Sequence, residues 1–169
     1  MSRIDITQDV VLERLVARLR EQLKLTARQC YETFDAFSPP IVPKGGQWCV
    51  AVSPADSGFV VGEQAPVNFT EEWNVTVTVY TRIALDPADH AEKMLRAPGR
   101  GMLVLKRKVL KALVGHDLLN ADGNTFLRQP LYATRAHRPV VAERAGSGER
   151  TFLGLQSVDF GVDFDWDIT

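Results

Sequence analysis

A row of carboxylates near the end of the sequence is the most prominent set of ionisable residues. Asp159, Asp163, Asp165 and Asp167 alternate with apolar or aromatic residues over positions 158–167. Alternation of this kind predicts a strand, in which residues on one face lie roughly 6.6 Å apart. A calcium ion instead needs several oxygens at about 2.4 Å from different directions, as a curled loop provides. The row therefore predicts a solvated acidic strand face rather than a metal site.

The histidines and cysteines form no motif that is typical of catalysis or metal binding. His90, His116 and His137 are isolated and lack the HExxH spacing of zinc enzymes. Cys30 and Cys49 are too far apart for a CxxC motif, so buried free thiols are expected. Burial within an apolar strand raises the pKa of a thiol such as Cys49 and makes it a poor nucleophile. We therefore expect no enzymatic activity, no bound metal and no cofactor.

A basic stretch provides the second candidate surface. Arg107, Lys108 and Lys111 fall on one side of a helix predicted from about Met102 to Val114, and Lys106 falls within its apolar arc. Such a face could contact a nucleic-acid backbone, but a formal net charge of -1 gives no global field for nucleic acid or an anionic membrane. A solvated helix face is the simpler interpretation. The alternative is an assembly contact, in which an acidic strand meets the basic helix of a neighbouring subunit.

The candidate subunit-interface residues combine these two surfaces. They are Lys106, Arg107, Lys108, Lys111, Asp163, Asp165 and Asp167. Reversing the charges of Lys108 and Lys111 should weaken assembly if this placement is right.

Helices and strands must position these residues, and the spacing of apolar residues along the sequence predicts where those elements lie. Apolar residues recur at three- and four-residue steps from about Thr7 to Leu25, which predicts an amphipathic helix. Strands are expected from Trp48 to Val52, from Phe69 to Leu85 and over the alternating residues from Val158 to Trp166. A further helical region is expected to begin at Asp86.

Proline and glycine mark the expected connections. The segment from Ser53 to Pro66 is predicted to be a loop or a loose hairpin tip. Phe126 to Ala133 could form a strand weakened by Pro130, and His137 to Arg150 is predicted to be a mobile connection.

Length and composition set the overall class. At 169 residues, with 45% hydrophobic and 24% charged residues, the chain is expected to form a single domain over residues 1–169. Strands grouped around helical segments predict an α+β fold with an antiparallel or mixed sheet and helices packed on one face. The sequence shows no signal peptide and no apolar run near the roughly 18 residues of a membrane span, so a cytoplasmic protein without membrane contact is expected.

The order of these elements is itself informative. The amphipathic N-terminal helix is followed by the proline-rich segment Ser38–Pro43, the strands Trp48–Val52 and Trp73–Tyr80, helices, and a closing strand that ends Phe164-Asp165-Trp166. This order resembles the tail terminator (minor tail protein U-like) family and related tail-completion proteins of long-tailed bacteriophages.

The resemblance implies a structural protein rather than an enzyme. Its implied partners are further copies of itself in a ring, expected to be a hexamer, together with a tail-tube protein and a head-joining protein. Its implied location is the cytoplasm during assembly and then the tail of the virion, whether phage- or prophage-encoded. The long segments Ser53–Pro66 and Asn120–Arg150 depart from the family pattern.

Two alternatives belong to other functional classes. The first is a small ligand-binding protein or enzyme with a pocket near Cys49, Tyr80, His90 and His116; thiol reactivity near neutral pH or a thermal shift with a small molecule would favour it. The second is a basic-helix nucleic-acid-binding protein, for which DNA affinity should fall steeply with salt.

Overall fold

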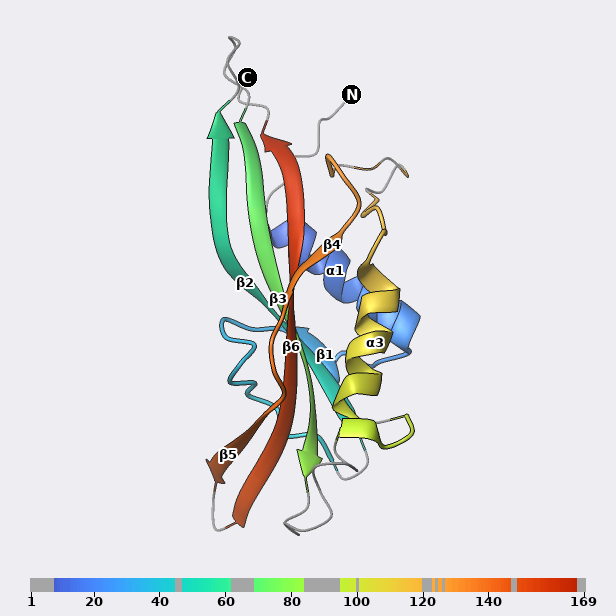
Figure 1. Ribbon diagram of the computed structural model, residues 1–169, viewed down its shortest axis with the longest axis vertical. Helices are drawn as coiled ribbons and strands as arrows, with labels where there is room; N and C mark the ends of the chain where they lie inside the picture. The colour runs from blue at the N-terminus through green and yellow to red at the C-terminus, as the bar shows by residue number, and fades with distance from the viewer. Residues whose placement is uncertain are drawn as a thin grey trace.

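The protein folds as an α+β structure with a six-stranded mixed sheet. The computed structural model describes residues 8–44, 47–61, 69–83, 95–99, 101–119, 123, 125, 127–146 and 149–166. Helices α1 (Gln8–Leu23) and α3 (Met102–Leu113) cover one face of the sheet, as predicted (Figure 1). The strands are β1 (Cys30–Glu32), β2 (Trp48–Val61), β3 (Phe69–Ile83), β4 (Tyr132–Ala136), β5 (Val140–Gly146) and β6 (Glu149–Trp166).

Strand β6 organises the sheet because it pairs along both of its edges. The strand order is β1-β2-β3-β6-β4, with β5 also paired to β6. One edge of β6 pairs with β3 from Phe69↔Trp166 to Ile83↔Phe152, while the other pairs first with β5 and then with β4. Only the β1–β2 pair is parallel among the described strands.

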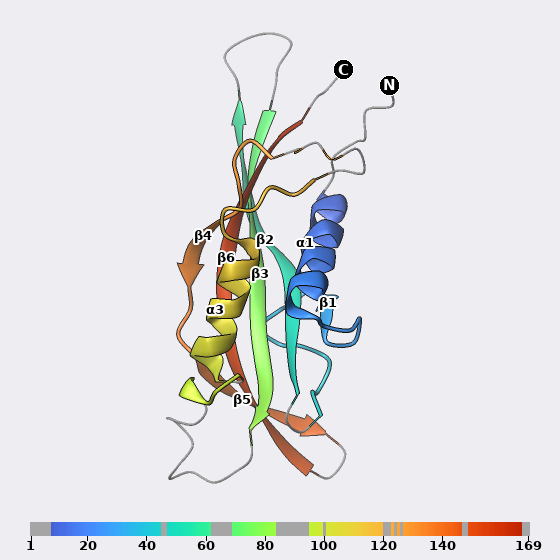
Figure 2. The same cartoon turned by 90° about the vertical axis from the view of Figure 1, so that its right-hand side faces the viewer.

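The main hydrophobic core lies between the sheet and the two helices. Figure 2 looks onto the helical face and shows α1 and α3 side by side over the long strands. Side chains alternate between the faces of a strand, so Trp73 and Val75 of β3 and Phe160 and Val162 of β6 all point toward the helices, where they are buried. Burial of each such side chain stabilises the fold by about 1.5–3 kcal/mol.

The opposite face is covered over only part of its length. Cys49, Ala51, Tyr80 and Leu155 form a smaller buried cluster there with Ala36. Ala36 belongs to the segment 33–44, which crosses this face after β1 (Figure 1). Farther along this face Ser53 and Thr76 are still buried, but Glu72 is exposed, so the cover ends within the length of the sheet.

The prediction of a loop from Ser53 was wrong as far as Val61. Strand β2 continues to Val61 because it pairs with β3 out to Val61↔Phe69. A register shift between Pro54 and Ser57 accommodates the proline, which cannot donate a ladder hydrogen bond. Residues 62–66 lie outside the described part of the chain.

The predicted mobile connection from His137 was also wrong over most of its length. Residues of β5 and the start of β6 form an antiparallel hairpin, with pairs from Val140↔Leu155 to Gly146↔Glu149. The strand expected from Phe126 to Ala133 begins only at Tyr132 as β4. Most of the helical region expected from Asp86 lies outside the described residues.

Candidate subunit interface

Asp163 is not part of a solvated face, contrary to the sequence prediction. Its exposed fraction is only 8%. The Tyr132 hydroxyl donates toward both carboxylate oxygens at 3.2 Å, and the Gln129 side-chain amide donates to one of them. Strand β4 and the residues before it therefore cover this part of β6.

A glycine makes this cover possible. Gly161 lies two residues before Asp163, and a Cβ atom placed on it would lie 2.2 Å from the nearest carbon of the Tyr132 ring. The missing side chain leaves room for the ring to lie against β6, from where its hydroxyl reaches Asp163.

Asp159 is also engaged within the subunit. Its carboxylate accepts a hydrogen bond of 2.8 Å from the Thr76 hydroxyl, and its other oxygen lies 2.8 Å from Nε2 of His137. The solvated-face prediction was therefore wrong for Asp159 as well as for Asp163. The side chain of Asp165 and the whole of Asp167 lie outside what the structure describes.

A hollow of about 510 Å³ lies beside these aspartates, on the sheet face opposite the helices. Strands β2, β3, β4 and β6 line it, and we call it the acidic hollow. Four carboxylates line it, against the single guanidinium of Arg135; they belong to Asp56, Glu72, Asp159 and Asp163.

Two of these carboxylates face each other directly. Glu72 of β3 is paired in register with Asp163 of β6, and both residues project from the face opposite the helices. Like charges directly opposite one another in a sheet are destabilising. Within the described part of the chain, no basic side chain forms an ion pair with either carboxylate. Burial raises the pKa of the nearby Tyr132 hydroxyl, and the charges of Asp163 and Glu72 raise it further.

Sequence reasoning missed two of these acids. Asp56 falls in the segment predicted to be a loop, and Glu72 was treated only as part of a strand. The available signal for Glu72 was the strand period, which places it on the face opposite Trp73.

The basic residues of α3 divide into exposed and engaged side chains. Arg107 and Lys111 are exposed, whereas Lys106 is half-buried. Lys108 turns back onto its own subunit: its ammonium group donates to the Gly99 carbonyl at 3.1 Å and lies 5.5 Å from the centroid of the Trp48 ring. Lys108 is therefore less free to contact a partner than the sequence suggested.

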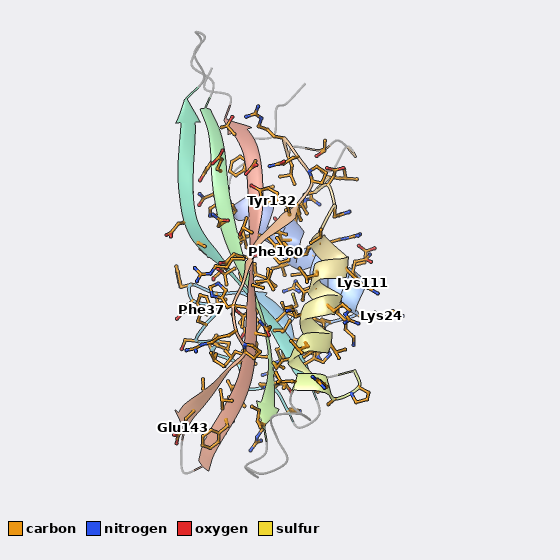
Figure 3. The ribbon with its side chains drawn as sticks, in the orientation of Figure 1. Lys24, Phe37, Lys111, Tyr132, Glu143 and Phe160 are labelled. Carbon is orange, nitrogen blue, oxygen red and sulfur yellow. The ribbon has the colours of Figure 1, made fainter. Side chains whose placement is uncertain are left out.

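The predicted basic and acidic surfaces do not meet within one subunit. Helix α3 packs on one face of the sheet, and the acidic hollow opens on the other. Figure 3 shows this separation for labelled residues, with Lys111 on the helical side and Phe37, in the segment 33–44, on the other.

The residues of the alternative ligand pocket do not converge either. Cys49 and Tyr80 lie in the smaller cluster on the face opposite the helices, where the Tyr80 hydroxyl bonds that of Tyr31. His116 follows α3 on the helical face, and burial, with the nearby charge of Arg18, lowers its pKa. His90 lies outside the described residues.

Both cysteines are free and buried, as predicted. Burial raises the pKa of Cys30 to about 12 and also raises that of Cys49. Neither thiol therefore has the thiolate character of a nucleophile at neutral pH.

The part of the chain that the structure describes contains neither a metal-binding cluster nor a membrane-spanning helix. Over these residues, histidine, cysteine and acidic side chains form no group of three or more that could hold a metal ion. Neither of the described helices is long and apolar enough to cross a membrane.

The sequence was compared with models of protein families and with curated proteins. Neither comparison finds a match. A function must therefore be inferred from the pattern of elements and from the surfaces described above.

Proposed function

We propose that this chain is a ring-forming tail terminator or tail-completion subunit of a phage or prophage. It caps the tail tube and joins it to the head. Its partners are further copies of itself, in a hexameric ring, together with the tail-tube and head-joining proteins. Its work is binding, without catalysis or a cofactor, first in the cytoplasm and then in the virion tail. The resemblance in the order of elements supports this proposal.

The observation that carries the proposal is the difference between the two faces of the sheet. One face bears α3, which contains four basic residues and no acidic residue. The other bears the acidic hollow. A closed ring is built from head-to-tail contacts, so each subunit needs two different and complementary surfaces. The two faces meet this requirement.

A twofold-symmetric dimer fits the same surfaces less well. Such a dimer places the same patch of both subunits in contact. Pairing α3 with a second α3 would bring like charges together, and so would pairing two acidic hollows. The charge distribution therefore favours head-to-tail assembly.

The elongated shape offers separate surfaces for axial partners. Strand β6 has 18 residues and therefore spans about 60 Å. The ends of β2, β3 and β6 project beyond α1 (Figure 1). We assign these projecting ends to the axial partners, the tail tube and the head protein.

Two measurements test the proposal. Negative-stain electron microscopy and light scattering of the purified protein, alone and with added tail tubes, should reveal closed rings. Sequencing of the DNA that flanks the gene should reveal tail-tube and head-joining genes. Metabolic or regulatory neighbours, together with a protein that stays monomeric in both preparations, would contradict the proposal.

A further inference from the structure

Among the described residues that line it, the acidic hollow has more carboxylates than cations. Glu72 is exposed and lies directly across the β3–β6 pair from Asp163. Asp56, also exposed, adds a further carboxylate at the irregularity in β2. Arg135 is the one cation among the described residues that line the hollow. A positively charged partner would relieve the repulsion between these carboxylates.

The width of the hollow suits a helix. The face between β2 and β4 spans three strand spacings, or about 14 Å. An α-helix with its side chains is about 10–12 Å across. A helix is therefore a suitable occupant, and a basic one satisfies the charge.

Helix α3 of a second copy has the matching pattern. Arg107 and Lys111 are four residues apart, so they lie on the same side of α3 with Cβ atoms about 5–6 Å apart. The two exposed acids lie close together on neighbouring strands, because Gly58 of β2 pairs with Glu72 of β3 and Asp56 lies two residues before Gly58. Two exposed cations on one side of the helix thus match two exposed carboxylates that line the hollow.

We infer that the acidic hollow of one subunit receives α3 of the next, with Arg107 and Lys111 facing Glu72 and Asp56. This inference rests on the proposed ring and identifies the joint that closes it. Lys108 contributes little to the joint, because it is held by Gly99 and Trp48 of its own subunit.

Charge reversal on each surface provides the test. The hollow variant carries Asp56→Lys and Glu72→Lys, and the helix variant carries Arg107→Glu and Lys111→Glu. Each variant alone places like charges in the joint, so its assembly midpoint should rise at least about tenfold in concentration at low ionic strength. Light scattering and sedimentation velocity measure the midpoint, and thermal melting confirms that each variant is folded.

Mixing the two variants gives the sharpest result. In an equimolar mixture every joint again pairs opposite charges, either native or reversed, so the variants should assemble together in a 1:1 ratio. Such a ring alternates the two variants and closes only with an even number of subunits, as a hexamer has. The combination of all four substitutions in one chain should also restore assembly.

A matched control separates the joint from net charge. Lys44→Glu with Arg138→Glu makes the same charge change as the helix variant at two exposed positions outside α3 and the hollow. This control should assemble like the wild type.

The possible failures are distinguishable. Rings that form normally from both variants would overturn the joint and leave the ring standing. Folded variants that fail to assemble both alone and when mixed would overturn the pairing of these two surfaces. A wild-type protein that remains monomeric at low ionic strength and with tail tubes would overturn the proposed ring itself.

Discussion

Gly161 is the position at which one added methyl group should reveal how β4 is held against the sheet. In Gly161→Ala the new Cβ would overlap the Tyr132 ring, with a nearest approach of 2.2 Å. Tyr132 is 36% exposed, so its ring can swing outward to avoid the clash. In doing so it gives up its hydroxyl contacts with the buried Asp163 carboxylate.

The magnitude follows from those lost contacts. A hydrogen bond to a charged group contributes about 1.5–3 kcal/mol, so Gly161→Ala should lower the free energy of unfolding by about 2 kcal/mol. For a domain of this size that corresponds to a fall of roughly 4–8 °C in melting temperature. Urea unfolding followed by circular dichroism, together with calorimetry, measures both quantities.

Two comparisons make the test specific. A Cβ on Gly58 would meet nothing within 4 Å, so Gly58→Ala in the neighbouring β2 should leave the melting temperature nearly unchanged. Tyr132→Ala removes the ring, so adding Gly161→Ala to it should cost almost nothing further. If Gly161→Ala were as stable as Gly58→Ala, or if its cost added fully to that of Tyr132→Ala, the contact would not hold β4.

Four further predictions concern buried and exposed ionisable groups. Asp163→Ala should lower the free energy of unfolding by about 2 kcal/mol in urea, because the Tyr132 hydroxyl and the Gln129 amide lose their hydrogen bonds to a buried carboxylate. Glu72→Ala should raise the free energy of unfolding slightly, by less than about 1 kcal/mol, because the substitution removes a like charge opposite Asp163. A loss of stability in Glu72→Ala as large as that in Asp163→Ala would contradict the different roles of these two acids. Cys49 should resist a disulfide reagent at pH 8 in the native protein and react fully after unfolding, because burial raises its pKa; rapid native reaction would contradict this. Burial lowers the pKa of His116, so the unfolded chain binds a proton on this ring more readily than the folded chain does. The neutral ring therefore makes its full contribution to stability above the unfolded pKa of 6.5, and this contribution is lost as the pH falls below that value. His116→Asn should accordingly weaken the dependence of melting temperature on pH between about 7 and 5, and an unchanged dependence would contradict the assignment.

Sequence periodicity identified the elements that bury one continuous face. The leucines and valines of α1 and the alternating residues of β3 and of the second half of β6 each carry their own pattern, so these elements were predictable. The extension of β2 beyond Val52 could not be predicted from the sequence, because Pro54 and Gly58 locally favour a turn. Only pairing with β3 makes that segment a strand, and the information for that pairing lies in another part of the chain.

The same limit applies to the candidate site. Alternation correctly placed Asp159 and Asp163 on the other face of β6 from Phe160 and Val162. It could not show what covers the face that bears the aspartates. The cover is β4, whose pairing with β6 joins residues more than 20 positions apart, such as Ala136 and Val158. The pairing of Glu72 with Asp163 likewise depends on the register between β3 and β6, which are still farther apart in the sequence.

Burial divides the acids of the hollow into two groups with different roles. Asp163 is buried and has donors within its own subunit, so its carboxylate serves the fold by anchoring Tyr132 and, through it, β4. Glu72 and Asp56 are exposed and do not anchor β4. They line the part of the hollow that β4 does not cover. Because Gly161 lets Tyr132 lie against β6, the same contact that satisfies Asp163 also forms one wall of the hollow. The shape of the hollow therefore depends on the buried acid, while its capacity to attract a basic helix depends on the exposed acids, and substitutions can separate the two.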